Sequence, residues 1–357
     1  MHWIVRREYM KHSYHLAYFA THAFMPTFTI IMLCCCGKTD SYKSADYRGN
    51  GFTSIVGTDL ANNDMSGYVK EGTSFDAKDI PAGNYSGITR LKGNSYAIVS
   101  DKDGKGGYFK FTIEIDSNGN ITSVKNNGFR ELEEKNKDQE AIAYNPDNHH
   151  IYIGCEETDE IVEYDILNGK KIDTLCIDEY KRNGVHNRKI ESLAFDRKRQ
   201  SLFTINEGPL KGDNHLMLRL IEIDTDMKRK MQYTYILDTP LDDGPCVDDS
   251  HAFGVAELLS LGDGTLLVLE REFKVEDMKI GSWVMNKIFR IRPGKLNKQF
   301  ITGWRTSLNV SDLGLANYEG MCLGPQLKDG RQVIIICADS QNRYGGVLRD
   351  WFKTVII

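Results

Sequence analysis

The stretch from Asn187 to Pro209, NRKIESLAFDRKRQSLFTINEGP, decides how this chain folds. Two short apolar runs flank the charged segment DRKRQ, and this pattern is typical of a β-hairpin. Glu191 stands near the start of the first predicted strand, and Glu207 stands at the end of the second. These two positions lie side by side at the open end of an antiparallel pair, so the hairpin carries two carboxylates at one edge.

The same hairpin recurs along the chain. Each copy has an apolar strand, a turn containing Gly, Asn or Asp, and a second apolar strand. A third strand of alternating polarity follows, and then a weaker, more polar fourth strand such as Met231–Asp238. Four short strands repeated in this way predict an all-β fold of the β-propeller class. The first strands begin, at intervals of 54, 51, 62 and 66 residues, at Ser86, Glu140, Glu191, Phe253 and Glu319.

The repeat predicts five four-stranded blades within one propeller domain that covers residues 51–357. The fifth unit has its third strand at Phe352–Ile357 and lacks a fourth. We expect the N-terminal segment Phe52–Gly57 to lend that strand and close the ring. The segment Tyr68–Asp76 leaves room for a sixth blade, so five and six blades both remain open.

The N-terminal segment differs from the body of the chain. After a basic start, the stretch Phe24–Cys36 is free of charge. It is too short to span a bilayer but is typical of the apolar core of a signal peptide. Its end, Leu-Cys-Cys-Cys-Gly, resembles a bacterial lipobox in which Cys36 becomes the lipidated residue.

We therefore expect residues 1–36 to be a signal peptide and residues 37–50 a polar tether. A lipid on Cys36 would place the protein in the periplasm, on the outer membrane or on the cell surface. An ordinary cleaved signal without a lipid is the alternative.

Composition excludes one large class of function. The chain has 357 residues, a formal net charge of -5, 41% hydrophobic residues and 27% charged residues. These values are ordinary for a globular protein, and no basic cluster with interleaved aromatic residues appears, so we expect no nucleic-acid partner. We expect a monomer whose contact with a membrane is limited to the N-terminal lipid.

The recurring acidic residues predict a metal site. In a propeller, the first strand of each blade lines the central channel, so the start of that strand and the end of the second strand share one rim. Carboxylates gathered there repel one another unless a cation neutralises them, and hard oxygen ligands suit Ca²⁺. The alternative is that each acid caps a hairpin or pairs with an arginine. The candidate metal ligands are Glu140, Glu191, Glu207, Glu270, Glu319 and Asp339, with Asp101 and either Glu156 or Glu157 at equivalent positions.

Two arginines accompany these acids. Arg188 lies three residues before Glu191, and Arg271 follows Glu270 directly. A guanidinium beside a carboxylate-bound cation would bind a phosphate group well, while a plain salt bridge is an equally open interpretation. The candidate catalytic residues are therefore Glu191, Glu319, Arg188 and Arg271. His186 and His251 precede first strands and could also reach the rim as acid or base.

A family resemblance is carried by three segments in the same order: NRKIESLAFD with the following EGP, then GVAELLSLGDGTLLVLERE, then NYEGMCLGPQLKDGRQVIIICADSQN. Together they resemble the phytase-like proteins described as having esterase-like activity of phytase, over about Tyr85 to Asn342. The resemblance implies a β-propeller in a bacterial protein outside the cytoplasm, and a loose relation to calcium-dependent propeller phytases. The sequence departs from the usual pattern at Phe253, which removes a ligand, and at Lys189 and Ser192, where Gly is common.

Two functional hypotheses follow. In the first, the chain is a calcium-dependent phosphoester hydrolase, with a small or phosphorylated substrate at the acidic channel mouth. In the second, it is a non-catalytic surface propeller that uses the same mouth to bind a sugar, a peptide or a protein. Propellers support many unrelated functions, so the fold does not choose between them.

Overall fold

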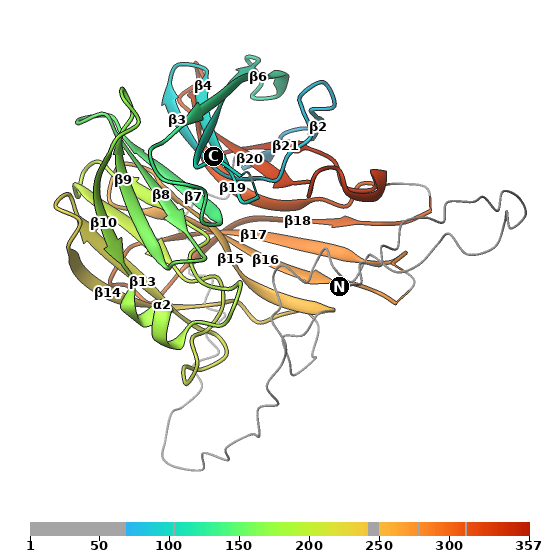
Figure 1. Ribbon diagram of the computed structural model, residues 1–357. Helices are drawn as coiled ribbons and strands as arrows, with labels where there is room; N and C mark the ends of the chain where they lie inside the picture. The colour runs from blue at the N-terminus through green and yellow to red at the C-terminus, as the bar shows by residue number, and fades with distance from the viewer. Residues whose placement is uncertain (1–68, 103, 242–249, 278, 311–312) are drawn as a thin grey trace, which may run out of the picture.

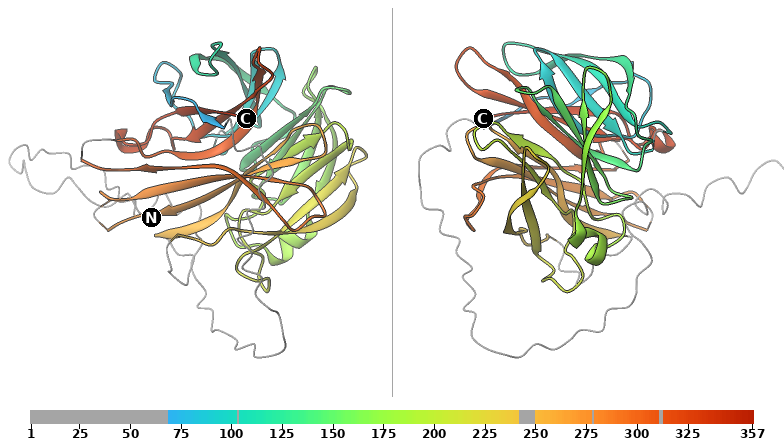
Figure 2. Two further views of the ribbon diagram at one scale, coloured as in Figure 1. Left: turned by 180° about the vertical axis from the view of Figure 1, so that it is seen from behind. Right: turned by 60° about the vertical axis from the view of Figure 1, so that its left-hand side comes forward.

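The computed structural model describes residues 69–102, 104–241, 250–277, 279–310 and 313–357. In this part of the chain, five antiparallel sheets stand around one axis as the blades of a β-propeller (Figures 1 and 2). The five-bladed prediction is thereby confirmed. The predicted signal peptide, Cys36 and the tether lie outside the described residues. No helix of the described part is long and apolar enough to cross a membrane.

The blades follow one another in chain order. Blade 1 consists of β3 (Tyr85–Lys92), β4 (Ser95–Ser100), β5 (Gly107–Ile115) and β6 (Ile121–Glu131). Blade 2 consists of β7 (Gln139–Asn145), β8 (His150–Cys155), β9 (Glu160–Asp165) and β10 (Lys171–Cys176). Blade 3 consists of β11 (Ala194–Asp196), β12 (Ser201–Ile205), β13 (Met217–Asp224) and β14 (Arg229–Ile236). Blade 4 consists of β15 (His251–Ser260), β16 (Leu266–Lys274), β17 (Trp283–Ile291) and β18 (Gln299–Ser307). Blade 5 consists of β19 (Asn317–Gln326), β20 (Gln332–Asp339) and β21 (Trp351–Ile356), completed from the N-terminal side.

The N-terminal side closes the ring, as predicted, but from a different segment. β1 (Lys70–Glu71) and β2 (Phe75–Asp76) both pair antiparallel with β21 at the outer edge of blade 5. The alternative of a sixth blade built on residues 68–76 is wrong, because this stretch supplies the missing edge of the fifth blade. The segment first expected to close the ring, Phe52–Gly57, lies outside the described residues.

Position within a blade explains the composition of each strand. The second strands are covered on both faces by neighbouring blades and read as continuous apolar runs; β20, for example, is buried from its second residue to its last. The fourth strands form the outer edge and are mixed in polarity, and the first six residues of β14 are all at least partly exposed. This gradient is why the hairpin of first and second strands is the clearest repeat in the sequence.

The core lies between the blades rather than within them. Five clusters of buried apolar residues each join two neighbouring blades, and the innermost strands contact one another in the closed order β3, β7, β11, β15, β19 and back to β3. Each interface packs side chains from two sheets, as in a sandwich. Closing the ring therefore buries the faces of all five sheets.

The turns at the end of the first strands use local side-chain hydrogen bonds. Asp263 Oδ1 accepts from Thr265 N at 2.9 Å, and Asp329 Oδ1 accepts from Arg331 N at 3.1 Å. The residue between each pair, Gly264 or Gly330, has a positive φ that favours glycine. These Asx turns help to set the register of the hairpins, and the Asp263 turn is also held from blade 3, where Asp196 Oδ2 accepts from Gly264 N at 3.0 Å.

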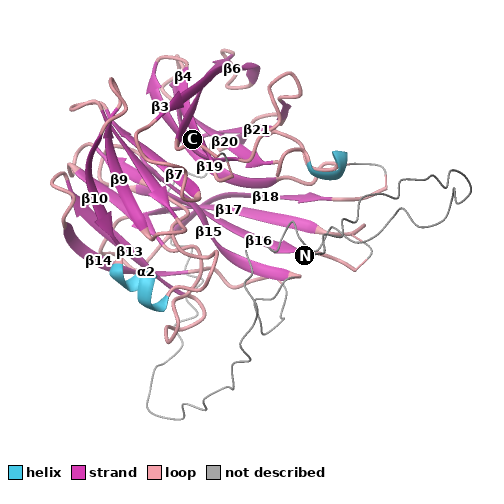
Figure 3. Cartoon of the chain, viewed as in Figure 1, coloured by secondary structure: helices cyan, strands magenta, loops and turns pink. Residues whose placement is uncertain are grey.

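Within the described residues, helix is confined to two short segments (Figure 3). They are α2 (Asp178–Asn183), which leads into blade 3, and the 3₁₀ turn η1 (Tyr344–Gly346) in blade 5. Blade 3 also departs from the predicted hairpin. The first strand keeps only the three residues of β11, and an isolated bridge between Ile190 and Asn206 holds the preceding segment. Glu191 therefore sits on irregular backbone at the channel.

Candidate functional site

One rim of the ring carries a cavity of about 260 Å³ whose lining is dominated by carboxylates. Lys102, His186 and the amides Asn187 and Gln341 complete the lining. We call this set of carboxylates the acidic mouth. Its seven members come from four of the five blades and are Asp101, Asp138, Glu140, Glu156, Glu191, Glu319 and Asp339.

Strand geometry brings these acids together. Glu140 and Glu319 lie at the starts of the first strands β7 and β19. Asp339 ends the second strand β20, and its Cα pairs with that of Asn317 across the hairpin. Because every blade presents the same two strand ends to the rim, the prediction that acids at these positions converge holds for blades 1, 2, 3 and 5.

Three of the carboxylates lie closest together. Asp101, Asp138 and Glu140 each offer an oxygen, and these oxygens all lie within 4.8 Å of one another. Asp138 adopts a φ of 63° just before β7, and its carbonyl accepts a 2.9 Å hydrogen bond from the Glu156 N–H. This unusual backbone conformation sets the Asp138 side chain beside the strand that carries Glu140.

Burial and mutual repulsion raise the pKa of several of these acids. Burial raises the pKa of Asp101 to about 6, although Lys102 opposes the shift. Burial also raises the pKa of Glu156 to about 8, against a 2.8 Å hydrogen bond from the Lys189 N–H. The pKa values of Glu140 and Glu191 are raised well above the ordinary range by burial and then by the neighbouring carboxylates. Without a bound cation, the folded protein therefore favours the protonated forms of these acids.

The acidic mouth fits a hard divalent cation. Its seven members offer carboxylate oxygens, which suit Ca²⁺ better than softer metals. In addition, Asp101 Oδ1 is buried and has no hydrogen-bond partner among the described residues. An ion bound by Asp101, Asp138 and Glu140 would satisfy this oxygen and relieve the repulsion within the group.

The two arginines predicted to clamp a phosphate do not line the cavity. Arg271 is 4% exposed; it donates to Glu319 Oε1 at 2.5 Å, to Asn317 Oδ1 at 2.7 Å and to Glu207 Oε1 at 3.2 Å. Arg188, also 4% exposed, donates to the Phe253 carbonyl, and its Nε lies 3.6 Å from Glu207 Oε2. Both guanidinium groups are therefore engaged in ion pairs beneath the rim, as in the salt-bridge alternative.

Two predicted metal ligands also lie elsewhere. Glu207 is buried between the arginines and does not line the cavity. Glu270 accepts from Tyr235 Oη at 2.5 Å and forms an ion pair with Lys298, both on the side of blade 4 that faces blade 3. Neighbouring residues of a strand lie on opposite faces of a sheet, so Glu270 faces blade 3, whereas Arg271 reaches Asn317 and Glu319 of blade 5.

The sequence did not identify one central residue of the site, Asp138. Of the two histidines expected to reach the rim, only His186 lines the cavity. Asp138 stands two residues before Glu140 at the entry to the same strand. Its role depends on a left-handed backbone that no repeat position indicates. His186 does line the cavity, whereas His251 is buried against Glu272, with Nε2 3.0 Å from Oε1.

The chain was compared with curated sequences and with solved structures. No curated protein sequence matches the chain. Among solved structures, the chain is similar to a Myxococcus xanthus glutaminyl cyclase, with 10% identity, 81% of this chain and 96% of that chain covered, and a TM-score of 0.43. It is also similar to Kuenenia stuttgartiensis hydrazine synthase, with 13% identity, 75% and 79% covered, and a TM-score of 0.38. These likenesses are too weak to bear on function.

The sequence match to a family is far more extensive. The family model named phytase-like, with the description "esterase-like activity of phytase", matches residues 80–341. That range includes all seven carboxylates of the acidic mouth and the inner strands of all five blades. The chain therefore belongs to this phytase-like family of β-propellers.

Proposed function

We propose that the acidic mouth binds a divalent cation, with Ca²⁺ as the first candidate, and that the chain hydrolyses phosphoesters there. The observation that carries the proposal is the convergence of Asp101, Asp138 and Glu140 at one side of a cavity large enough for a small ligand. The family description, esterase-like activity of phytase, supports a hydrolytic reaction on an ester. We therefore propose Asp101, Asp138 and Glu140 as the metal ligands, in place of the six ligands expected from the sequence.

The cation and the surrounding side chains would have different roles in ester hydrolysis. A bound divalent cation would polarise the oxygen of an ester group and offset the charge of a phosphate. Glu156, whose pKa is about 8, keeps a proton near neutral pH and is suited to donate it to a leaving oxygen. Lys102 and His186 line the cavity and can contact an anionic substrate, in place of the arginines.

A second candidate function is capture of a ligand without turnover. One observation favours it: both predicted phosphate-binding arginines are engaged by Glu207, Glu319 and the Phe253 carbonyl. Among the described residues that line the cavity, two basic side chains, Lys102 and His186, accompany seven carboxyl groups. Such a surface suits a calcium-bridged sugar or a cationic peptide as well as a phosphate.

The test is hydrolysis of a phosphomonoester panel that includes inositol phosphates, with a carboxyl ester for comparison. Each substrate is assayed with Ca²⁺ and then with excess chelator. The proposal predicts turnover that requires Ca²⁺ and that falls by about a hundredfold or more in Glu140→Gln. Asp226→Asn, an exposed acid at the β13–β14 turn, is the matched control and should keep full activity.

Calorimetric titration of Ca²⁺ separates the two candidates. If Ca²⁺ binds in a way that depends on Glu140 but no ester is hydrolysed, the chain is a ligand-binding propeller and not a hydrolase. Turnover that persists in chelator and in Glu140→Gln would contradict the metal-dependent site itself.

A further inference from the structure

The face of the ring opposite the acidic mouth carries a hollow lined by basic residues. Each blade's first strand starts at the mouth and ends at the other face, where the turn Asp263–Thr265 connects β15 to β16. The loop between β17 and β18 and the turn between β11 and β12 reach the same face. We call this region, between blades 3 and 4, the basic hollow; its cations are Lys198, Arg199, Arg290, Arg292, Lys295 and Lys298.

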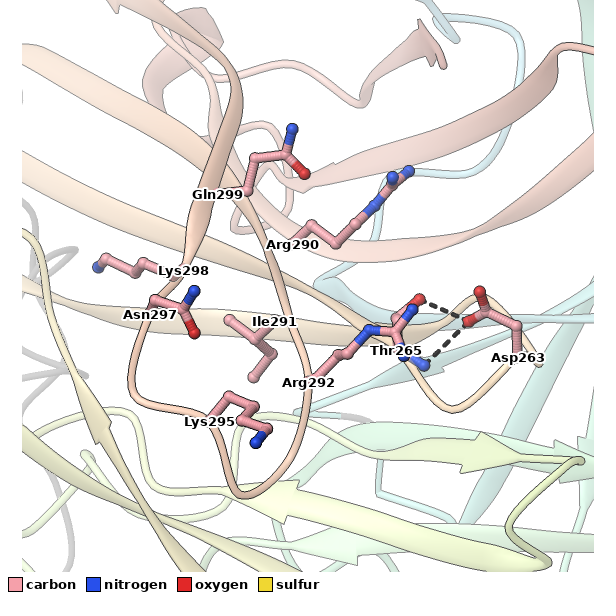
Figure 4. A pocket seen from close by; sticks show the side chains of 9 residues that line it. All are labelled: Asp263, Thr265, Arg290, Ile291, Arg292, Lys295, Asn297, Lys298 and Gln299. Atoms are coloured by element: carbon pink, nitrogen blue, oxygen red, sulfur yellow. Dashed lines mark hydrogen bonds between the residues drawn. The ribbon is translucent and has the colours of Figure 1, made fainter. Parts of the chain in front are cut away.

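The basic hollow is large and continuous. It consists of two adjoining cavities of about 620 Å³ and 270 Å³ that share Asp263, Arg292 and Lys295. Figure 4 shows the larger cavity, with Arg292 directed toward Asp263 and Thr265, and Lys298 pointing away from Arg292. The amides of Asn297 and Gln299 add neutral hydrogen-bonding groups to the lining.

Two of the six cations are neutralised within the protein. Arg199 makes a bidentate pair with Glu222, with Nε 3.2 Å from Oε1 and Nη2 2.7 Å from Oε2. Lys298 pairs with Glu270 at 2.5 Å and lies over the ring of Phe289. Because Arg199 and Lys298 form these ion pairs, the unpaired positive charge of the hollow comes from its other four basic residues.

The other four cations have no such partners. In the described part of the chain, the side chains of Lys198, Arg290, Arg292 and Lys295 make no hydrogen bond or ion pair, and Arg290 Nε is buried without an acceptor. The nearby acid, Asp263, already accepts from Thr265 N at 2.9 Å and Thr265 Oγ1 at 2.5 Å (Figure 4). Burial would raise the pKa of Asp263, but these bonds and the charge of Arg292 lower it.

Exposed lysines are commonly solvated and need no partner, so exposure of Lys198 and Lys295 alone would indicate nothing. Here the cations converge on one concave surface of a protein whose net charge is -5, and one guanidinium N–H is removed from water without an acceptor. A buried unpaired donor is costly, and an anionic oxygen is the group that would satisfy it best.

We propose that the basic hollow is a binding site for a ligand that carries two or more phosphate groups. Arg290 and Arg292 present guanidinium groups suited to bidentate phosphate contacts, and Lys198 and Lys295 supply point charges across the two cavities. Asn297 and Gln299 can accept or donate to hydroxyls beside the phosphates. The ligand is either a soluble phosphorylated molecule or the headgroup of an anionic phospholipid. This site is separate from the acidic mouth and does not depend on its function.

The experiment measures binding of two probes to the full chain in the presence of chelator, so that cation-dependent binding at the acidic mouth cannot contribute. Inorganic pyrophosphate is titrated by calorimetry, and vesicles of phosphatidylglycerol in phosphatidylcholine are tested by co-sedimentation. The test variant combines Lys198→Gln, Arg292→Gln and Lys295→Gln. The control variant makes the same change in net charge with Lys92→Gln, Lys125→Gln and Lys328→Gln, three exposed lysines outside the hollow.

The proposal predicts that affinity falls at least about tenfold in the test variant and little in the control, and that binding weakens as salt rises. Loss of pyrophosphate binding identifies a soluble phosphorylated ligand, and loss of vesicle binding alone identifies a lipid headgroup. Absence of binding to either probe, or equal loss in both variants, would overturn the proposal. Circular dichroism of both variants checks that they are folded.

Discussion

The guanidinium of Arg271 in blade 4 lies 3.2 Å from the carboxylate of Glu207 in blade 3. The same guanidinium lies 2.5 Å from Glu319 Oε1 in blade 5. All three side chains are buried, so the pairs hold three consecutive blades together where the ring would otherwise place unpaired charges next to the channel. Arg271 is therefore a structural link beneath the acidic mouth.

Removing this link should destabilise the fold. We expect Arg271→Gln to lower the free energy of unfolding by about 3–5 kcal/mol, because it leaves the buried Glu319 carboxylate without its cation and removes one of the two arginines that pair with Glu207. Urea unfolding followed by tryptophan fluorescence measures the change. Arg331→Gln is the control, since Arg331 pairs with Asp329 at a partly exposed turn and should cost about 1 kcal/mol or less. Similar losses in the two variants would contradict the structural role of Arg271.

Calcium should stabilise the folded chain if the acidic mouth binds it. A ligand that binds only the native state at a hundred times its Kd adds about 2.7 kcal/mol to the free energy of unfolding. We therefore expect Ca²⁺ to raise the Tm of the wild type, and to leave the Tm of Asp138→Asn and Glu140→Gln nearly unchanged. Asp226→Asn should respond like the wild type. If Ca²⁺ still raises the Tm of both Asp138→Asn and Glu140→Gln, the metal binds at another site.

Stability without a metal should depend on pH in a defined direction. Asp101 and Glu156 have folded-state pKa values of about 6 and about 8, above the ordinary values of 3.8 and 4.5, chiefly because of burial. Between about pH 4 and pH 8 the folded state thus holds protons that the unfolded state has lost. The free energy of unfolding should fall as pH rises through this window.

Chemical denaturation in chelator at pH 5 and pH 8 checks this expectation. Glu156→Gln cannot titrate at that position, so its stability should fall less steeply over the same range. Added Ca²⁺ should reduce the loss at pH 8, because it offsets the charge that builds up in the mouth. A metal-free protein that becomes more stable from pH 5 to pH 8 would contradict the raised pKa values.

One glycine of the inner strands permits close packing between blades. A Cβ added at Gly320 would lie 2.5 Å from the Ser86 carbonyl oxygen of blade 1 and 2.6 Å from Cys337 Sγ. We expect Gly320→Ala to cost about 1–3 kcal/mol of stability through overpacking. Gly104 has open space around the equivalent Cβ, and Gly104→Ala should change stability by less than about 1 kcal/mol. Equal effects of the two substitutions in urea unfolding would refute this packing argument.

Much of the fold could be predicted from local pattern. The alternation of apolar residues and the turns at Asp263 and Asp329 are properties of neighbouring residues, so each hairpin was recognisable alone. Five blades followed from the count of the repeated hairpins, with six left open, and closure from the N-terminal side followed from the missing fourth strand of the last unit. The exact closing residues did not, because β1 and β2 are two residues long and carry little apolar signal.

The site was predicted less completely. The acids at strand ends were found because every blade repeats the same two positions, and Glu140, Glu191, Glu319 and Asp339 do meet at one mouth. Glu270 was misplaced because its strand extends to Lys274, which puts Glu270 within β16 rather than at its end. Asp138 was missed because its placement depends on one left-handed residue outside the repeat.

By itself, the sequence determined that the chain repeats a β-hairpin, that its blades form a propeller, and that acids gather at one rim. Only the tertiary structure decided which acids share a cavity, that Arg188 and Arg271 are held in buried ion pairs, and that unpaired cations from two blades form a hollow on the far face. The reason is physical: hairpin patterns reflect contacts between residues near one another in the chain. Charge pairing across blades depends instead on side-chain directions that exist only once the ring has closed.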